Sequence, residues 1–173
     1  ISPPDDDSIL VTGPEAWDRV QRVNLTSVYL CCKEVLPYML EQGKGSIINT
    51  ASFVAVMGSA TSQISYTASK GGVLAMTRTL AVEWARHKIR VNAIAPGPFE
   101  SEGASGNLWP DGDVKARLMA GIPAGRFATA SEVADHAVWL LSGASDYVTG
   151  ECFTMDGGAS LGRGMWEPGE RVR

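Results

Sequence analysis

Two short apolar segments, each preceded by a long helical pattern, constrain the fold of this chain more than any other feature. Residues 15–42 predict a long amphipathic helix, and residues 46–50 follow as a strand. The apolar stripe of this helix recurs every three to five positions and comprises Trp17, Val20, Val23, Val28, Cys31, Val35 and Met39. Residues 65–87 repeat the helical pattern and residues 89–95 the strand pattern. Strands that alternate with helices form a parallel sheet covered on both faces. We therefore expect an α/β fold with a doubly wound parallel sheet.

The C-terminal half continues this alternation after an irregular segment. Residues 98–112 are rich in Gly, Ser, Pro and Glu and show no periodicity, which is typical of a functional loop. A short helix is expected over residues 114–120. Thr129 and Glu132 have the spacing of a capping box, which predicts the start of a helix that runs to residue 141. A last strand, residues 152–155, is followed by Asp156-Gly157-Gly158.

Composition excludes several classes of function. A chain of 173 residues, 45% hydrophobic and 20% charged, suits one domain, which we expect over residues 1–158, with a C-terminal tail over residues 159–173. The formal net charge is -4 and there is no run of Lys or Arg, so we expect no nucleic-acid partner. No apolar stretch approaches the roughly 20 residues of a membrane span, so we expect no membrane association.

The cysteines and histidines indicate neither disulfides nor a metal. Cys31, Cys32 and Cys152 are odd in number and two are adjacent, a spacing that predicts neither a disulfide framework nor a zinc site. A reducing, cytoplasmic location fits best. His87 and His136 have no His, Cys or carboxylate at ligand spacing, so we expect no metal site and place both on helix surfaces.

Tyr66 and Lys70 are the leading candidates for chemistry. They stand four residues apart in the expected 65–87 helix, so both side chains lie on one face within reach of a common ligand. An isolated phenol has a pKa near 10, so proton exchange at neutral pH requires a nearby positive charge, which Lys70 supplies. A shift of two or three units corresponds to roughly 3 to 4 kcal/mol, which one ammonium beside a second positive charge could provide.

Tyr29 and Lys33 form a second pair with the same spacing, so spacing alone does not choose between them. Tyr29 lies in the middle of the 15–42 helix within an apolar stripe, whereas Tyr66 starts a helix just after a strand and a loop. Catalytic groups in open α/β sheets lie at strand ends and helix starts. We therefore predict that Tyr66 is catalytic and that Tyr29 is structural.

Several motifs, in the correct order, resemble the short-chain dehydrogenase/reductase family. They are Asn24-Leu25, Ser52 at a strand end, Tyr66-Thr-Ala-Ser-Lys70-Gly-Gly, Ile89-Arg-Val-Asn-Ala-Ile-Ala-Pro-Gly97, and Thr149-Gly150 through Asp156-Gly-Gly158. The resemblance runs from about residue 1 to residue 158 and implies a Rossmann-like fold. It also implies reversible interconversion of an alcohol and a ketone, with hydride transfer to or from NAD or NADP, by a homotetramer acting on a small-molecule substrate.

The same resemblance implies a role for each matching residue. Tyr66 would be the general acid in reduction and the general base in oxidation, and Ser52 would donate a hydrogen bond to the developing alkoxide. Lys70 would favour the phenolate and bind the nicotinamide ribose, while Asn24 would hold a water in a proton relay behind it. The residues that would border the nicotinamide amide are Pro96, Gly97, Phe99 and Ser101, the last where Thr is frequent.

Two departures from the family pattern matter. Ser52 precedes Tyr66 by fourteen residues instead of the usual thirteen, and since Phe53 has no hydroxyl, we expect the intervening loop to bulge. The glycine-rich phosphate turn, the residue that selects NAD or NADP, and the Asn-Asn-Ala-Gly strand end do not precede Ile1. We therefore expect the C-terminal two-thirds of an enzyme whose N-terminal part is missing. The alternative, from another class, is a truncated, cofactor-free interaction protein that retains the dimerising helices.

Within the enzyme interpretation the substrate stays open. The stretch from residue 121 to the end of the chain resembles 3-oxoacyl-carrier-protein reductases, but also sugar, polyol and steroid dehydrogenases. The basic residues in segment 98–120 that an acidic acyl-carrier protein could contact are Lys115 and Arg117. This small number favours a small hydroxylated or cyclic substrate over a 3-oxoacyl thioester. The side chains that could line the substrate site are apolar (Phe99, Leu108, Trp109, Met119) and acidic (Glu100, Glu102, Asp111, Asp113).

Residues 1–173 alone should bind neither NADH nor NADPH measurably. In a doubly wound sheet the pyrophosphate lies on N–H groups of the first strand-to-helix turn, which this sequence does not contain. The isolated chain should also expose apolar helix faces and an unpaired sheet edge, so we expect it to aggregate. Calorimetric titration tests this, and micromolar binding by a stable, soluble chain would contradict it.

Overall fold

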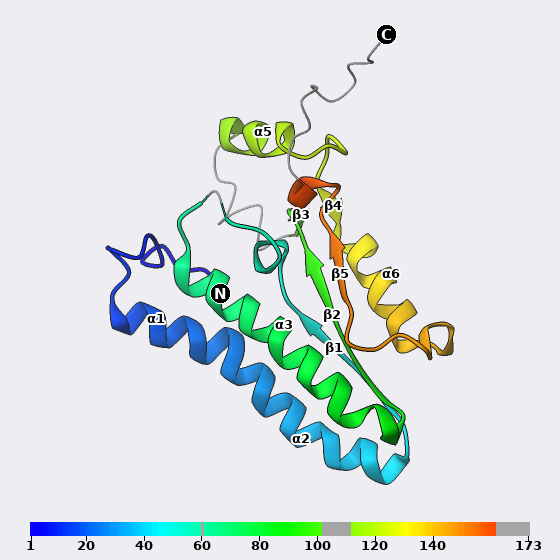
Figure 1. Ribbon diagram of the computed structural model, residues 1–173. Coiled ribbons are helices and arrows are strands. Elements are labelled where there is room, and N and C mark those ends of the chain that lie inside the picture. The colour runs from blue at the N-terminus through cyan, green and yellow to red at the C-terminus, as the bar shows by residue number, and fades with distance from the viewer. Residues whose placement is uncertain (60, 102–111, 162–173) are drawn as a thin grey trace.

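A three-stranded parallel sheet forms the centre of the molecule (Figure 1). The structure, a computed structural model, describes residues 1–59, 61–101 and 112–161. The strand order is β1 (Gly45–Thr50), β2 (Ile89–Pro96) and β5 (Cys152–Met155). Both pairings are parallel, so all three carboxyl ends meet at one edge of the sheet. The predicted parallel sheet is confirmed.

Helices cover both faces of this sheet. On one face lie α1 (Pro14–Gln21), α2 (Ser27–Gln42) and α3 (Ile64–Trp84), and on the other lies α6 (Ala130–Leu141) (Figure 1). A fifth helix, α5 (Gly112–Ala120), lies beyond the carboxyl edge of the sheet (Figure 1). Single 3₁₀ turns are formed by η2 (Phe53–Ala55), η3 (Ala85–His87), η4 (Gly143–Ser145) and η5 (Ala159–Leu161).

The core lies between the sheet and α2 and α3. Seven of the eight β2 residues are buried, and only Arg90 is partly exposed. Two clusters of buried side chains fill the space between the sheet and these helices, and both include residues of β2. They are Cys32, Leu36, Ile47, Ala81, Ile89 and Val91 in one group, and Ala51, Val73, Leu74, Ala93 and Ala95 in the other.

The helix predicted over residues 15–42 is interrupted around Asn24. A π-helical turn, η1 (Arg22–Thr26), joins α1 to α2. Because a π turn holds more residues than an α turn, it shifts the phase of the buried face. Buried positions therefore include Ala16, Val20, Asn24 and Cys32. Three members of the predicted stripe are instead exposed, namely Trp17, Val23 and Cys31.

The segment after β2 contains a short strand pair that sequence periodicity did not predict. β3 (Phe99–Glu100) pairs in parallel with β4 (Ala128–Thr129). Two-residue strands are too short to show an alternating pattern. Four predicted lining residues, Glu102, Leu108, Trp109 and Asp111, and the tail from residue 162 onward lie outside the described residues.

His136 corrects one expectation from the sequence. Instead of lying on a helix surface, its ring packs against Phe153 at 4.9 Å and Trp139 at 5.3 Å between ring centres. His87 is exposed, as predicted. All three cysteines are free thiols. The described residues contain no group of three or more potential metal ligands, and none of their helices has the length and hydropathy needed to cross a membrane.

The predicted capping box at the start of α6 is confirmed. Thr129 Oγ1 accepts a hydrogen bond from the Glu132 backbone N–H, and Glu132 Oε2 accepts one from the Thr129 N–H at 2.8 Å. Arg126 adds an ion pair to the same carboxylate at 2.7 Å. The Arg126 hydrogen bond, followed by the cap, lowers the pKa of Glu132 to about 2.

Glu132→Gln in the full-length protein should therefore lower the Tm at pH 7 by about 2 °C, the scale of an exposed ion pair. The folded-state pKa is about 2 against an ordinary value of 4.5, so the stabilisation is fully present above the ordinary value and is lost as the pH falls toward 2. The Tm difference between the two proteins should shrink over that range. Thermal unfolding followed by circular dichroism measures it, and a difference that does not change with pH would contradict the assignment.

Candidate functional site

The predicted catalytic side chains gather where β1 ends and α3 begins. Ser52 follows β1 by two residues and is 6% exposed, while Tyr66 and Lys70 lie one turn apart near the start of α3 and are partly exposed. Lys70 Nζ donates a hydrogen bond to the carbonyl oxygen of Thr50 at 2.8 Å. The same atom lies 5.7 Å from the centre of the Tyr66 ring. The structure thus brings Tyr66, Lys70 and the end of β1 together.

Strand register explains why Ser52 lies at this edge. Thr50 is opposite Ile94 in the β1–β2 ladder, and the Ala51 N–H donates to the Ile94 carbonyl at 2.8 Å. Two more residues in the same register place Ser52 level with Pro96. Open α/β sheets carry their binding sites outside this carboxyl edge.

The hydroxyl groups of Ser52 and Tyr66 form no hydrogen bond with any described residue. Both are therefore available to a molecule that lies over the end of β1. A 3₁₀ turn, η2, begins directly after Ser52, in the loop where the extra residue was expected to form a bulge. It stays a prediction that this bulge leaves the Ser52 hydroxyl close enough to Tyr66 for both to contact one substrate oxygen.

Asn24 is buried and reaches Lys70 only indirectly. Its Nδ2 donates to the Ile1 carbonyl at 2.8 Å and to Ser69 Oγ at 3.2 Å, and its Oδ1 accepts from the Ile1 nitrogen. Ser69 Oγ in turn donates to the Tyr66 carbonyl at 2.7 Å. Asn24 is therefore linked to the turn that carries Tyr66 and Lys70. The contribution of Ser69 was not predicted, although it stands three residues after Tyr66, where a helical side chain reaches back one turn.

The Lys70 ammonium lies close to the Tyr66 ring in a partly buried position, where it loses some of its hydration. Burial lowers the pKa of Lys70 because it disfavours the ammonium form. Among the described residues, no carboxylate pairs with this ammonium. Its charge is therefore directed at the Thr50 carbonyl and the Tyr66 ring.

The residues expected to border a nicotinamide divide into two pairs. Pro96 and Gly97 stand at the carboxyl end of β2, where the Gly97 N–H donates to the Met155 carbonyl at 2.9 Å. A Cβ at Gly97 would lie 2.8 Å from the Cα of Asp156, so only glycine fits this crossing. Phe99 belongs to the β3–β4 pair, and Ser101 follows it and is partly exposed.

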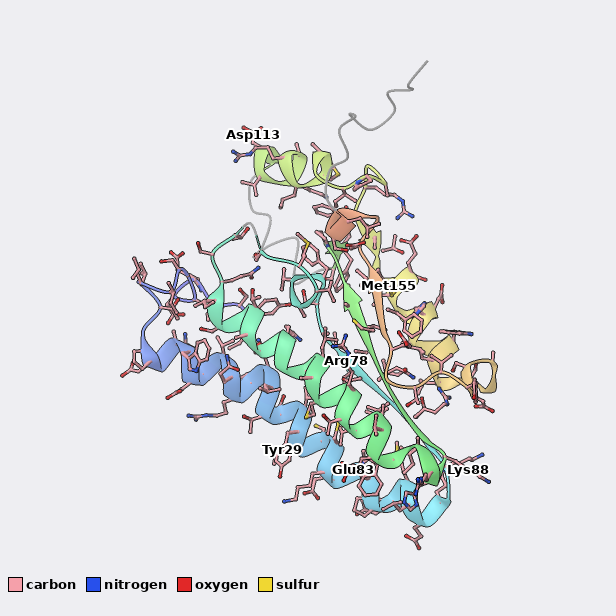
Figure 2. All side chains as sticks on the ribbon, in the orientation of Figure 1. Tyr29, Arg78, Glu83, Lys88, Asp113 and Met155 are labelled. Carbon is pink, nitrogen blue, oxygen red and sulfur yellow. The ribbon has the colours of Figure 1, made fainter. Side chains whose placement is uncertain are left out.

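Tyr29 and Lys33 lie on α2, away from the carboxyl ends of the strands where Ser52 and Tyr66 gather. Tyr29 is 49% exposed on α2, and Figure 2 shows it pointing away from α3. Its predicted position inside an apolar stripe is wrong, since the π turn rotates it outward. Its position in mid-helix, away from the edge of the sheet, is as predicted.

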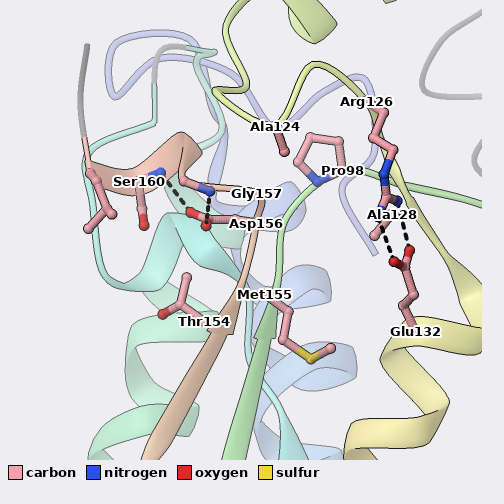
Figure 3. Close-up of a pocket in the computed structure, with 12 residues that line it drawn as sticks. Pro98, Ala124, Arg126, Ala128, Glu132, Thr154, Met155, Asp156, Gly157 and Ser160 are labelled. Carbon is pink, nitrogen blue, oxygen red and sulfur yellow. Dashed lines mark hydrogen bonds and ion pairs between the residues drawn. The ribbon is translucent and has the colours of Figure 1, made fainter. Parts of the chain in front are cut away.

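A cavity of about 550 Å³ opens beside the loop after β5 (Figure 3). The Asp156 carboxylate there accepts hydrogen bonds from the N–H groups of Gly158 and Ser160, and Arg126 pairs with Glu132. Neither Ser52, Tyr66 nor Lys70 lines this cavity, so we do not place the reaction in it. Its lining comprises Pro98, Ala124, Arg126, Ala128, Glu132, Thr154, Met155, Asp156, Gly157, Gly158, Ser160 and Leu161.

Comparison with known proteins identifies the family. Residues 1–160 match a family model described as enoyl-(acyl carrier protein) reductase. A probable 2,4-dienoyl-CoA reductase of Bacillus subtilis is 37% identical over 149 residues, which are 86% of this chain and 59% of that protein. A 3-oxoacyl-[acyl-carrier-protein] reductase of Chlamydia pneumoniae is 40% identical over 153 residues, 88% of this chain and 60% of that protein. The chain belongs to the short-chain dehydrogenase/reductase family.

Solved structures of this family share the fold. A gluconate 5-dehydrogenase from Burkholderia cenocepacia, in complex with NADP and tartrate, superposes with a TM-score of 0.84 at 32% identity, over 90% of this chain and 60% of that one. A 3-oxoacyl-[acyl-carrier protein] reductase from Brucella melitensis with bound NAD gives 0.83 at 32% identity, over 92% and 59%. The Rossmann-like fold is confirmed, and the chain spans about six-tenths of the length of these short-chain dehydrogenases/reductases.

Proposed function

We propose that the full-length protein is an NAD- or NADP-dependent oxidoreductase that interconverts a secondary alcohol and a ketone. The observation that carries this proposal is the pairing of Tyr66 with Lys70 on α3, with Lys70 Nζ held 2.8 Å from the Thr50 carbonyl at the carboxyl edge of the sheet. This arrangement sets a phenol beside a cation at the edge where open α/β sheets bind ligands.

Each side chain has a definite task in this reaction. Tyr66 donates a proton to the carbonyl oxygen in reduction and removes it from the hydroxyl in oxidation. The Lys70 charge stabilises the phenolate that remains after proton donation. Ser52 donates a hydrogen bond to the same substrate oxygen, on which negative charge develops. These roles are supported by the hydroxyl groups of Ser52 and Tyr66, because neither is hydrogen-bonded to a described residue and both can reach a substrate oxygen.

The residues at this edge fit a nicotinamide nucleotide, which would supply or accept the hydride. Lys70 donates one of its three N–H groups to Thr50, which leaves two for the hydroxyls of the nicotinamide ribose. The similar proteins with bound NADP and bound NAD support this class of cofactor and favour neither member. The residues assigned to the border of the nicotinamide amide are Pro96, Gly97, Phe99 and Ser101.

Asn24 completes the proposed site through a proton relay with Lys70 and a bound water. Its buried position in the π turn and its hydrogen bond to Ser69 support a role close to α3. π turns inside α-helices frequently occur at functional sites. Through Ser69, Asn24 also contacts the helical turn that carries Tyr66.

A small hydroxylated or cyclic substrate fits the charges near α5 better than an acyl-carrier-protein thioester. Lys115, one of two basic residues expected to attract an acidic carrier, pairs with Glu100 at 2.8 Å. Arg117 donates to the Asp113 carbonyl at 3.4 Å. Both kinds of substrate occur among the names of similar proteins, so a 3-oxoacyl thioester is the second candidate.

Tyr66→Phe in the full-length protein should lower turnover at least about a hundredfold, the scale of a lost general acid/base. Tyr29→Phe, the matched control, should leave turnover nearly unchanged because Tyr29 is exposed on α2. The turnover of both variants is measured from the oxidation of NADH or NADPH, with 5-oxogluconate and with an acetoacetyl thioester as the ketone substrates. Equal losses from the two substitutions would refute the choice of Tyr66. A fluorescence titration without saturable NADH or NADPH binding would favour the interaction-protein alternative.

We also propose that the full-length protein is a cytoplasmic homotetramer, in keeping with its free thiols. The outward faces of α2 and α3 carry the exposed side chains of Leu30 and Val82, which are 48% and 82% exposed. On the opposite face of the sheet, Val138 and Leu141 of α6 are 64% and 60% exposed, and β5 is an edge strand. Two separate apolar surfaces suit an assembly with two kinds of twofold axis.

Val82→Glu should therefore reduce the mass of the full-length protein from that of a tetramer, because it sets a charge into the proposed helix contact. Val11→Glu is the matched control, since Val11 is 70% exposed in the N-terminal loop, outside both surfaces. Light scattering measures the masses. A monomeric parent protein would overturn the proposal.

A further inference from the structure

The first turn of α3 lacks a cap of its own. Backbone N–H groups in the first turn of any helix have no partner within that helix. Gln63 occupies the N-cap position of α3, and its side chain accepts no hydrogen bond from the helix. The N–H groups of Ile64, Ser65 and Tyr66 must therefore find acceptors elsewhere, and Tyr66 is the proposed acid/base.

A distant loop supplies those acceptors. Asp6 Oδ1 accepts a hydrogen bond from the Ser65 N–H at 2.9 Å, and Asp6 Oδ2 accepts one from the Tyr66 N–H at 2.8 Å. The carbonyl of Asp7 accepts from the Ile64 N–H at 3.1 Å. In Figure 1 this loop lies beside the beginning of α3, although the hydrogen-bonded residues are about sixty positions apart in the sequence.

Burial and backbone hydrogen bonds fix Asp6 and its loop beside the first turn of α3. It is only 5% exposed, and its own N–H donates to the Pro3 carbonyl at 3.0 Å. The neighbouring Asp7 N–H donates to Thr12 Oγ1 at 2.8 Å. The opposite side of the same helical turn is fixed by Gln21 Nε2, which donates to the Ser65 carbonyl at 2.9 Å.

The buried Asp6 charge is balanced by the helix itself. Among the described residues, no basic side chain forms an ion pair with this carboxylate. The positive end of a helix favours an anion, and hydrogen bonds from N–H groups to a carboxylate are stronger than neutral ones. The contact therefore ties the backbone of Tyr66 to the loop by a charge-assisted hydrogen bond.

We propose that Asp6 is a positioning residue for Tyr66. By accepting the Tyr66 N–H it sets where α3 begins, and so where the phenol lies relative to the substrate oxygen. Lys70 has its own hydrogen bond at Thr50, so loss of Asp6 displaces Tyr66 more than Lys70. The inference rests on the proposed function of Tyr66 as the acid/base.

Asp6→Ala and Asp6→Asn in the full-length enzyme test this. Asp6→Ala should lower kcat on the order of tenfold, since small misplacements of reacting groups are costly. Asp6→Asn keeps one acceptor oxygen for the two N–H groups and should lose less, about threefold. The Kd for NADH or NADPH, whichever the enzyme uses, and the KM of that cofactor should change less than twofold. If Asp6→Ala does not fold, Asp6→Asn decides by the same criteria.

Thr129→Ala is the control for a merely structural effect. It removes the N-cap of α6, which carries none of the proposed catalytic residues, and should lower the Tm without lowering kcat. If the Asp6 variants retain the kcat of the parent, or if Thr129→Ala lowers kcat equally at equal loss of Tm, the positioning role is wrong. Tyr66→Phe, measured alongside, separates the two proposals: if it keeps full turnover, the proposed function itself fails.

Discussion

The burial of β2 between two strands and two layers of helix is the constraint on which the remaining structure depends. A strand buried on both faces can satisfy its backbone only through its neighbours, and β2 does so with β1 on one side and β5 on the other. The parallel direction of both pairings brings three carboxyl ends to one edge. Ser52, Pro96 and Asp156 then lie close to that edge because each follows or ends a strand.

α3 is fixed to the rest of the molecule along its whole length, which keeps its reactive groups in place. Its first turn is bonded to the N-terminal loop, and Lys70 reaches the end of β1. At Gly72 an added Cβ would lie 2.8 Å from a methyl carbon of Leu25, so α3 and η1 touch closely, whereas Gly71 has open space beside it. Further along, Asn49 Nδ2 of β1 donates to Thr77 Oγ1 at 2.9 Å. Such support from several directions is what preorganised chemistry requires.

Sequence patterns predicted the regular elements well and the irregular ones poorly. β5 was predicted over the residues it occupies, and the Thr129 cap was found because its signal spans only four residues. The π turn and the β3–β4 pair were missed, since neither produces a periodic signal. Tyr66 and Lys70 were recognisable from local spacing and context, and their catalytic roles stay predictions. Asp6 was missed because its partners lie about sixty residues away and its neighbours in the sequence are also Asp.

The extra residue in η1 makes the helical segment from residue 14 to residue 42 intolerant of changes in length. Each residue advances an α-helix by about 100°, so a single deletion within Arg22–Thr26 would turn α1 by that angle relative to α2. Ala16 and Val20 would leave their buried positions, and Asn24 could no longer reach both Ile1 and Ser69. A substitution here changes one contact, whereas an insertion or deletion changes the register of two helices at once. Length variation among related proteins should therefore be confined to the loops that flank this segment.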